Sequence, residues 1–402
     1  MKNKKGKLLS ALLAAALAFS LFAGMPMTAS AAGAADLVDA INDINVVHGG
    51  SGSLIATQTG DTVTVTGSVV GAQHGFDMEI GAGVTLVWKA DYSTTELPGR
   101  VIRMGGDGVF RMESGSIITS CIEPLLTVYT SATGTLTVEI SGGIMRNIFA
   151  GGVIDYFPAN GNIMVNGGTV SAASGTVIRT DGANTNVTVE SGSVAASGTG
   201  TAIHTIGAGA GITVSGGTVS SENGDAIIAE GVNSSVTVNN TGKVSYSGGT
   251  GAAISAKGGY SKITISDNGA VNSTNSQAIH VDGTNASVEV SGRASVLAPW
   301  NAIDVTGVNG SVSVSGGMVK TTGTESGASA IYMNSGSGIA SVTVTNGIVS
   351  AAGPEWNHAI CTDGGNALIT VSGGRLEAVG SYGTIHIKSE SSTVSVSGGL
   401  VF

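Results

Sequence analysis

Histidine and aspartate side chains recur at one position of an internal repeat in this sequence, where a pair of them could support acid–base chemistry. Aligning the repeats places His204, His280 and His386, three of the six histidines, in a single column. Asp304 follows His280 in that column, on an adjacent rung at about strand spacing. A histidine beside a carboxylate could act as a general base, and a carboxyl group could protonate a leaving group. The alternative is that these are free surface positions of a repeat, and the absence of a paired-Asp or Arg-base motif favours this alternative over catalysis.

Nucleophilic and metal chemistry receive less support from the pattern. Cys361 precedes His386 in the column, but nothing in the sequence orients a third member of a nucleophile–base relay. Asp-Gly-x-Asn is similar to part of a calcium loop, yet the complete repeat GGxGxDx is absent. We therefore expect no cofactor and interpret these steps as turns, with calcium as the one metal that the pattern leaves open. They begin at Asp181, Asp282 and Asp363.

Aromatic residues form a second candidate site, for binding. Trp300 in LAPWNAI and Trp356 in GPEWNHAI occupy equivalent bends two coils apart, and Tyr382 follows one coil later. Two coils correspond to about 10 Å, close to the disaccharide repeat of a β-linked glycan. Flat aromatic faces can stack on sugar rings, unless each tryptophan folds down to fill a wide bend. With the polar residues of the neighbouring strands, the predicted ligand-binding residues are Trp300, Trp356, Tyr382, Asp304, Tyr332 and His280.

These candidates are positioned by a repeat that runs through most of the chain. Within each unit, apolar residues alternate with period two, which indicates strands. Each unit holds three short apolar pieces separated by bends. The pattern predicts a solenoid with about 25 residues and three strands per coil, in which each strand pairs in parallel with its copy in the next coil. The apolar-x-apolar units begin at intervals of 24 to 30 residues, at Val138, Ile163, Val187, Ile212, Val236, Ile263, Val288, Val312, Val342, Ile369 and Val394.

One bend of the repeat exchanges asparagine for glycine. Both residues tolerate positive φ, so the exchange predicts a left-handed backbone position there. The residues concerned are Asn184, Asn233, Asn285, Asn309, Asn366, Gly209 and Gly338.

The repeat resembles the right-handed parallel β-helix superfamily, which includes pectate lyases and surface adhesins. The phrase ITVSGGTV with a following AI strand also resembles β-helical carbohydrate-binding and surface proteins of Gram-positive bacteria. The resemblance covers roughly residues 50–402 and rests on the sequence motifs of the strands and turns, so it implies architecture more than function. It implies an all-β, single-stranded right-handed parallel β-helix.

Both ends of the sequence differ from the repeat. Residues 1–31 combine a lysine-rich start, the apolar stretch LLSALLAAALAFSLFAG and a small-x-small site, which is the pattern of a cleaved signal peptide. Residues 32–49 carry apolar residues at helical spacing and predict a short helix that caps the first coil. The solenoid of residues 50–402 stops in mid-repeat at SGGLVF, so we expect either a fragment of a longer protein or an uncapped last coil.

Charge and cysteine content limit the partners. Residues 1–31 hold four basic residues and no acidic one, so the remainder has 13 basic and 27 acidic residues and a net charge of −14. Such a surface repels nucleic acid and anionic lipid, so we expect neither as a partner. No stretch after residue 31 is apolar enough to span a bilayer, so we expect no membrane insertion after signal cleavage. A polyanionic glycan would be repelled too, unless calcium bridges it. Cys121 and Cys361 lie on the order of 40 Å apart in the stack, beyond disulfide reach.

The expected function is that of an exported, non-catalytic β-solenoid. It would be secreted, either free or associated with the cell surface. There it would act as a binding or adhesion module for a polysaccharide such as a cell-wall or host-surface glycan. The alternative is a polysaccharide lyase or glycoside hydrolase on the same fold. A third reading is ice binding, because the outward column of the first strand is rich in threonine, although threonine simply suits exposed strand positions.

Overall fold

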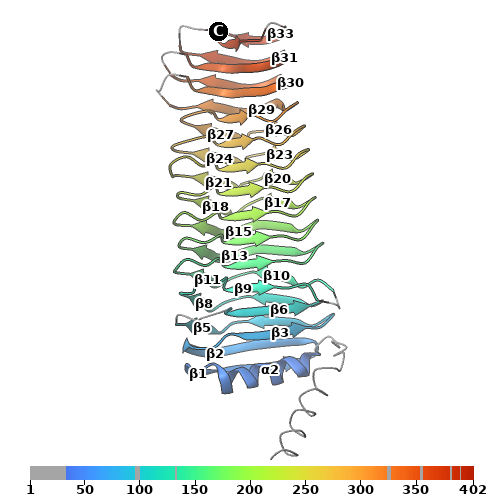
Figure 1. The fold of residues 1–402 in the computed structure, drawn as a ribbon, viewed down its shortest axis with the longest axis vertical. Helices are drawn as coiled ribbons and strands as arrows, with labels where there is room; N and C mark the ends of the chain where they lie inside the picture. Colours follow the sequence, from blue (N-terminus) through green and yellow to red (C-terminus); the bar gives the residue numbers. More distant parts are fainter. Residues whose placement is uncertain are drawn as a thin grey trace, which may run out of the picture.

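The computed structural model describes residues 33–95, 100–131, 134–323, 327–353, 356–380, 383–389 and 391–402. The predicted signal peptide and Tyr382 lie outside the described residues. The described chain winds into a long stack of about 13 turns with one helix at its N-terminal end (Figure 1).

Each turn contributes a first, a second and a third strand to three faces of the stack. The separate first strands are β4 (Thr85–Trp88), β7 (Val109–Met112), β10 (Thr137–Ile140), β17 (Gly211–Val214), β20 (Ser235–Val238), β23 (Lys262–Ile265) and β26 (Ser287–Val290). The separate second strands are β5 (Asp91–Thr94), β8 (Ser116–Thr119), β11 (Ile144–Asn147), β18 (Thr218–Ser221), β21 (Lys243–Tyr246), β24 (Ala270–Ser273) and β27 (Ser295–Ala298).

Some turns have a first strand that runs on into the second through a bulge. These joined strands are β2 (Thr62–Ala72), β13 (Asn162–Ala172), β15 (Asn186–Ala196), β29 (Ser311–Thr321) and β33 (Thr393–Val401). The third strands are β3 (Phe76–Ile80), β6 (Ile102–Gly106), β9 (Leu126–Val128), β12 (Ile154–Tyr156), β14 (Ile178–Thr180), β16 (Ile203–Thr205), β19 (Ile227–Ala229), β22 (Ile254–Ala256), β25 (Ile279–Val281), β28 (Ile303–Val305) and β32 (Ile385–Ile387). All three strands of a turn merge in β30 (Ser329–Ala351) and in β31 (His358–Ala378).

Pairing between turns is parallel and keeps a fixed register. Val187 pairs with Ile212, which pairs with Val236 in the turn after, and the second and third strands pair in the same way. The prediction of a right-handed parallel β-helix with three strands and about 25 residues per turn is therefore confirmed.

Inward-facing aliphatic side chains form one continuous core along the stack. Val214 is fully buried, as are Ile212, two residues earlier on the same strand, and Val238 in the next turn. Burying each such side chain stabilises the fold by roughly 1.5–3 kcal/mol. The N-terminal turns contain larger residues, and there Tyr92 packs edge-on against both Phe76 and Trp88. Cys121 and Cys361 are also buried and are not joined by a disulfide.

Helix α2 (Ala34–Val47) covers the N-terminal end of the stack and confirms the predicted cap. Its buried face contains Leu37, Ile41 and Ile44, and Asp36 accepts a hydrogen bond from the N–H of Gly33 at 2.8 Å. Strand β1 (Ser51–Thr59) pairs antiparallel with β2, an exception to the parallel pattern. Strand β1, which the repeat did not predict, lies with α2 across the first turn (Figure 1). Among the described residues, no helix has the length and hydropathy needed to cross a bilayer.

The predicted left-handed bend is confirmed in most turns. Asn184, Asn233, Asn285 and Asn309 have φ between 54° and 59°. Their side chains also form ladders, in which Asn184 Nδ2 donates to Asn160 Oδ1 at 3.1 Å. The prediction is wrong for Gly338 and Asn366, because the last turns place their left-handed residues earlier in the bend, at Gly336, Gly364 and Gly365.

Candidate functional site

The third strands bring the candidate residues onto one surface, which we call the third face. Its middle row contains the outward residue directly after the first buried aliphatic or aromatic residue of each third strand, such as His280 after Ile279, and its flanking row contains the residue two positions later. The predicted column is confirmed by the register, since Ser255 pairs with His280, His280 with Asp304, and Asp304 with Tyr332. The whole middle row reads Asp77, Arg103, Thr127, Asp155, Arg179, His204, Ile228, Ser255, His280, Asp304, Tyr332, Cys361 and His386.

Charged side chains of these two rows are mostly paired with one another between neighbouring rungs. Glu79 is bound by the hydroxyl of Tyr129, over whose ring Arg103 lies at 4.1 Å. Exposed side chains are paired as well: the Asp77 side chain is 66% exposed and still forms an ion pair with Arg103. The ion pairs are Arg103 with Asp77, Arg179 with Asp155 and Asp181, His204 with Glu230, His280 with Asp304, and Lys388 with Asp363.

His280 and Asp304 form the most buried of these pairs. His280 Nδ1 lies 3.6 Å from Asp304 Oδ2, the separation of an ion pair, and the Asp304 side chain is only 9% exposed. Interaction with the Asp304 carboxylate raises the pKa of His280 above its usual value, and burial opposes this shift. Gln277 Nε2 donates to the same oxygen of Asp304 at 3.0 Å and holds it in place. The pair therefore favours the protonated form of His280.

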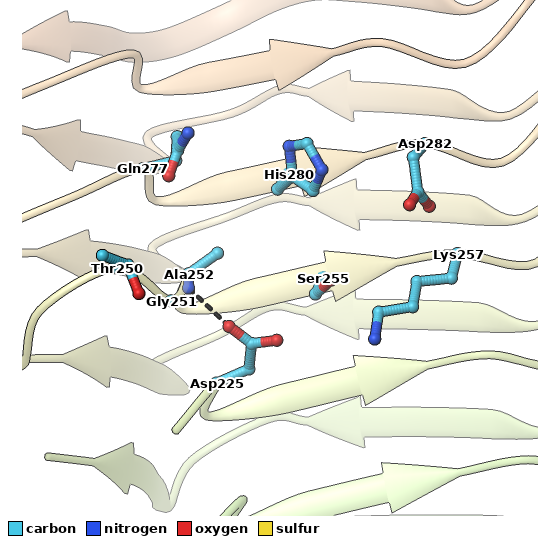
Figure 2. Close-up of a pocket in the computed structure, with 9 residues that line it drawn as sticks. All are labelled: Asp225, Thr250, Gly251, Ala252, Ser255, Lys257, Gln277, His280 and Asp282. Carbon is cyan, nitrogen blue, oxygen red and sulfur yellow. Dashed lines mark hydrogen bonds between the residues drawn. The ribbon is translucent and has the colours of Figure 1, made fainter. Parts of the chain in front are cut away.

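A shallow hollow of about 250 Å³ opens beside this pair, and we call it the polar hollow. Small residues of the β22 turn leave the space, and Lys257 extends across its lower part towards Asp225 (Figure 2). Asp225 Oδ1 accepts a hydrogen bond from the N–H of Ala252 at 2.6 Å. The full lining is Asp225, Thr250, Gly251, Ala252, Ser255, Lys257, Gln277, His280 and Asp282.

The middle row places a serine, a histidine and an aspartate on three successive rungs, the residue types of a hydrolytic triad. No hydrogen bond joins Ser255 to His280 among the residues that the structure describes, and Ser255 is only 3% exposed. Activation of a nucleophile requires that contact. The arrangement therefore supports hydrogen bonding to a ligand better than covalent catalysis.

The two predicted tryptophans lie at the bends before the third strands. Trp300 is 38% exposed and Trp356 is 48% exposed. Trp300 lines a second hollow of about 230 Å³ with Thr274, Asn275 and Pro299, which we call the tryptophan hollow. Segment 274–277 contributes to both hollows, since Thr274 and Asn275 line this one and Gln277 lines the polar hollow.

The asparagines beside the tryptophans stabilise the bends. Asn301 Oδ1 accepts a hydrogen bond from the N–H of Ser329, and Asn357 Oδ1 accepts one from the N–H of Ala328, both at 2.9 Å. Both asparagines are buried, so their amide oxygens are not available to a ligand.

Farther along the face, Tyr332 and the last histidine have local partners. The Tyr332 hydroxyl donates to Asp363 Oδ2 at 3.3 Å, and burial raises the pKa of Tyr332 to about 12. Burial likewise raises the pKa of the Cys361 thiol, so this residue is a poor nucleophile. His386 stacks on His358 instead of activating Cys361.

Two of the three Asp-Gly bends have an aspartate that is paired with a basic side chain. Asp181 binds Arg179, and Asp363 binds Lys388, both at 2.8 Å. In the described part of the chain, no group of three or more His, Cys, Asp or Glu side chains is placed to hold a metal ion.

Sequence reasoning missed Lys257, Gln277 and Asp225 as residues of one hollow. Their common signal was weak, because the hollow depends on the small residues of GGTGAAISA between them. Comparison with known proteins adds no relative, since no family model, curated protein or solved structure matches this chain.

Proposed function

We propose that the protein is an exported, non-catalytic binding module that retains a polysaccharide along its third face. The observation that carries this proposal is the pair of partly exposed tryptophans, Trp300 and Trp356, at bends bordering that face. Indole faces gain energy from the apolar C–H surfaces of sugar rings. The bends are two turns apart, about 10 Å, which suits the repeat of a β-linked glycan.

Secretion is part of the same proposal. The lysine-rich start and apolar stretch of residues 1–31 support export, and the resemblance to β-helical surface proteins of Gram-positive bacteria supports a role as an adhesion module at a cell surface. The middle row and the hollows provide hydrogen-bonding groups next to the tryptophans. The paired charges of the third face, the missing hydrogen bond between the described residues Ser255 and His280, and the raised pKa of the Cys361 thiol support binding over cleavage.

Affinity electrophoresis tests this proposal. Gels containing hydroxyethylcellulose, xylan, galactomannan or polygalacturonate would be compared with gels without polymer, and each polymer would be assayed in parallel for new reducing ends and unsaturated products. We expect at least one neutral polymer to retard the protein without product release. Product release would instead support the lyase or hydrolase alternative.

Matched aromatic variants locate the binding surface. The double variant Trp300→Ala, Trp356→Asn should abolish retardation. Asparagine is chosen at position 356 because φ there is 54°, in the left-handed region that asparagine tolerates. Tyr260→Asn is the control, since Tyr260 is 62% exposed on a different bend, with φ 59°, where other turns carry asparagine. If the tryptophan variant is retarded as strongly as the wild type by every polymer that retards the wild type, the proposal is contradicted.

A further inference from the structure

Two opposite charges in the flanking row stay unpaired on adjacent rungs. Lys257 and Asp282 directly follow Ala256 and Val281, which are register partners. Within the described residues, neither side chain makes a hydrogen bond or an ion pair. All other charged residues of the middle and flanking rows have a partner. The break in the pairing coincides with the polar hollow, which both residues line.

The hollow therefore offers two donors and two acceptors that the fold does not use. Lys257 can donate from its ammonium group, and His280, whose other ring nitrogen faces Asp304, can donate from Nε2. Asp282 can accept through both oxygens, and Asp225 through the oxygen that does not bind Ala252. Figure 2 shows these four side chains around one opening.

We propose that the polar hollow is a binding site for a single uncharged sugar unit, recognised through its hydroxyl groups. This inference rests on the proposed polysaccharide binding and names the sugar class. A hydroxyl group both donates and accepts, so neighbouring hydroxyls can satisfy a carboxylate and an ammonium together. The volume of about 250 Å³ is small for a larger ligand.

Charge balance argues against ionic ligands at this position. A uronate carboxylate or a phosphate would approach Lys257 but also face Asp225 and Asp282. A protonated amino sugar would approach those aspartates but also face Lys257 and His280. A neutral sugar meets neither repulsion. The tryptophan hollow, lined by Thr274 and Asn275 of the segment that also carries Gln277, would then stack the adjoining sugar unit.

Isothermal titration calorimetry of the full chain with cellohexaose, xylohexaose, mannohexaose and trigalacturonate tests the inference. The variants are Asp282→Asn and Lys257→Met, which remove one charge each from exposed positions. Lys262→Met and Glu289→Gln are the controls, because this exposed ion pair lies on the first strands. We expect a neutral hexaose to bind, each hollow variant to weaken it by about tenfold or more, and the controls to change it less than about twofold.

The outcomes separate the two proposals. If a neutral hexaose binds and loses affinity with Trp300→Ala but not with Asp282→Asn or Lys257→Met, the polar hollow is not a sugar site and polysaccharide binding stands. If trigalacturonate binds more tightly than every neutral hexaose, the assignment to uncharged sugars is wrong. If neither polymers nor oligosaccharides bind the wild-type chain, both proposals are wrong.

Discussion

The rings of His358 and His386 lie stacked, with their centroids 4.6 Å apart and their planes 11° from parallel. Burial, followed by the nearby charge of His358, lowers the pKa of His386. A depressed histidine pKa contributes stability that is present above the unfolded value of about 6.5 and is lost as the pH falls through the folded value. The last turns should therefore loosen on acidification.

Amide hydrogen exchange would measure this loosening. We expect exchange of β31 and β32 to accelerate several-fold between neutral pH and about pH 5, after correction for intrinsic rates, while β15 changes little. His386→Gln should remove most of the difference. Equal acceleration in the variant would show that the stacked pair is not the cause.

His280 should respond to pH in the opposite direction. Its pKa is raised by Asp304, so the stabilisation from this pair is fully present below about pH 6.5 and is lost as the pH rises through the folded pKa. In a titration of the His280 ring protons by NMR, Asp304→Asn should lower the midpoint. A midpoint unchanged by this variant would mean that Asp225 or Asp282 controls the charge instead.

Val214→Asp should unfold the turns around β17. The substitution places an unpaired carboxylate in a fully buried stack, at a cost of several kcal/mol, roughly the price of an uncompensated buried charge. Limited proteolysis should cut near β17 in this variant. The control is Thr213→Asp, one residue earlier on the outward side of the same strand, which should stay within about 0.5 kcal/mol of wild type.

Trp300→Ala with Trp356→Asn should leave the free energy of unfolding nearly unchanged. Both side chains are more than a third exposed, so we expect a loss below about 1 kcal/mol in denaturant titration. A loss of several kcal/mol would identify the tryptophans as packing groups of their bends, and a weakened glycan interaction would then have to be attributed to misfolding.

Calcium should not change the thermal midpoint. The carboxylates of Asp181 and Asp363 are already bound to Arg179 and Lys388. Asp282 has no such partner, but among the described residues it belongs to no group of three or more His, Cys, Asp or Glu side chains placed to hold a metal ion, far short of the six to eight oxygen ligands of calcium. We expect shifts below about 1 °C with millimolar calcium or chelator. A rise of several degrees that chelator reverses would establish a calcium site at an Asp-Gly bend.

The repeat was sufficient to predict the register of the third face. The apolar residue that precedes the middle row, such as Ile279 or Ile303, is anchored in the core, and this anchor sets which polar residues meet on adjacent rungs. The antiparallel β1 was not predictable in this way, because Leu54 is its only buried residue and carries no repeat signal. The exchange of asparagine for glycine did not locate the left-handed residues of the last turns either, which are Gly336, Gly364 and Gly365.

The polar hollow was hidden from sequence reasoning for a different reason. A hollow is defined by missing volume, and here Ser255 and Gly251 supply it between longer neighbours. Asn301 adjoins Trp300 in the sequence, but its side-chain oxygen accepts a hydrogen bond from the N–H of Ser329 in the next turn. Both outcomes depend on contacts between turns, which one repeat does not contain.

The ladder of parallel pairs also determines how the molecule would respond to tension. In the parallel part of the stack, each strand pairs with its copies in the turns before and after it, as Ile212 does with Val187 and Val236. Force applied along the chain from the C-terminal end would therefore detach one turn at a time. A turn of 25 residues, such as that from Val187 to Ile212, would release a contour length of about 80–90 Å. Stretching would then yield a series of nearly equal steps that stops at the antiparallel hairpin and the helix beneath it.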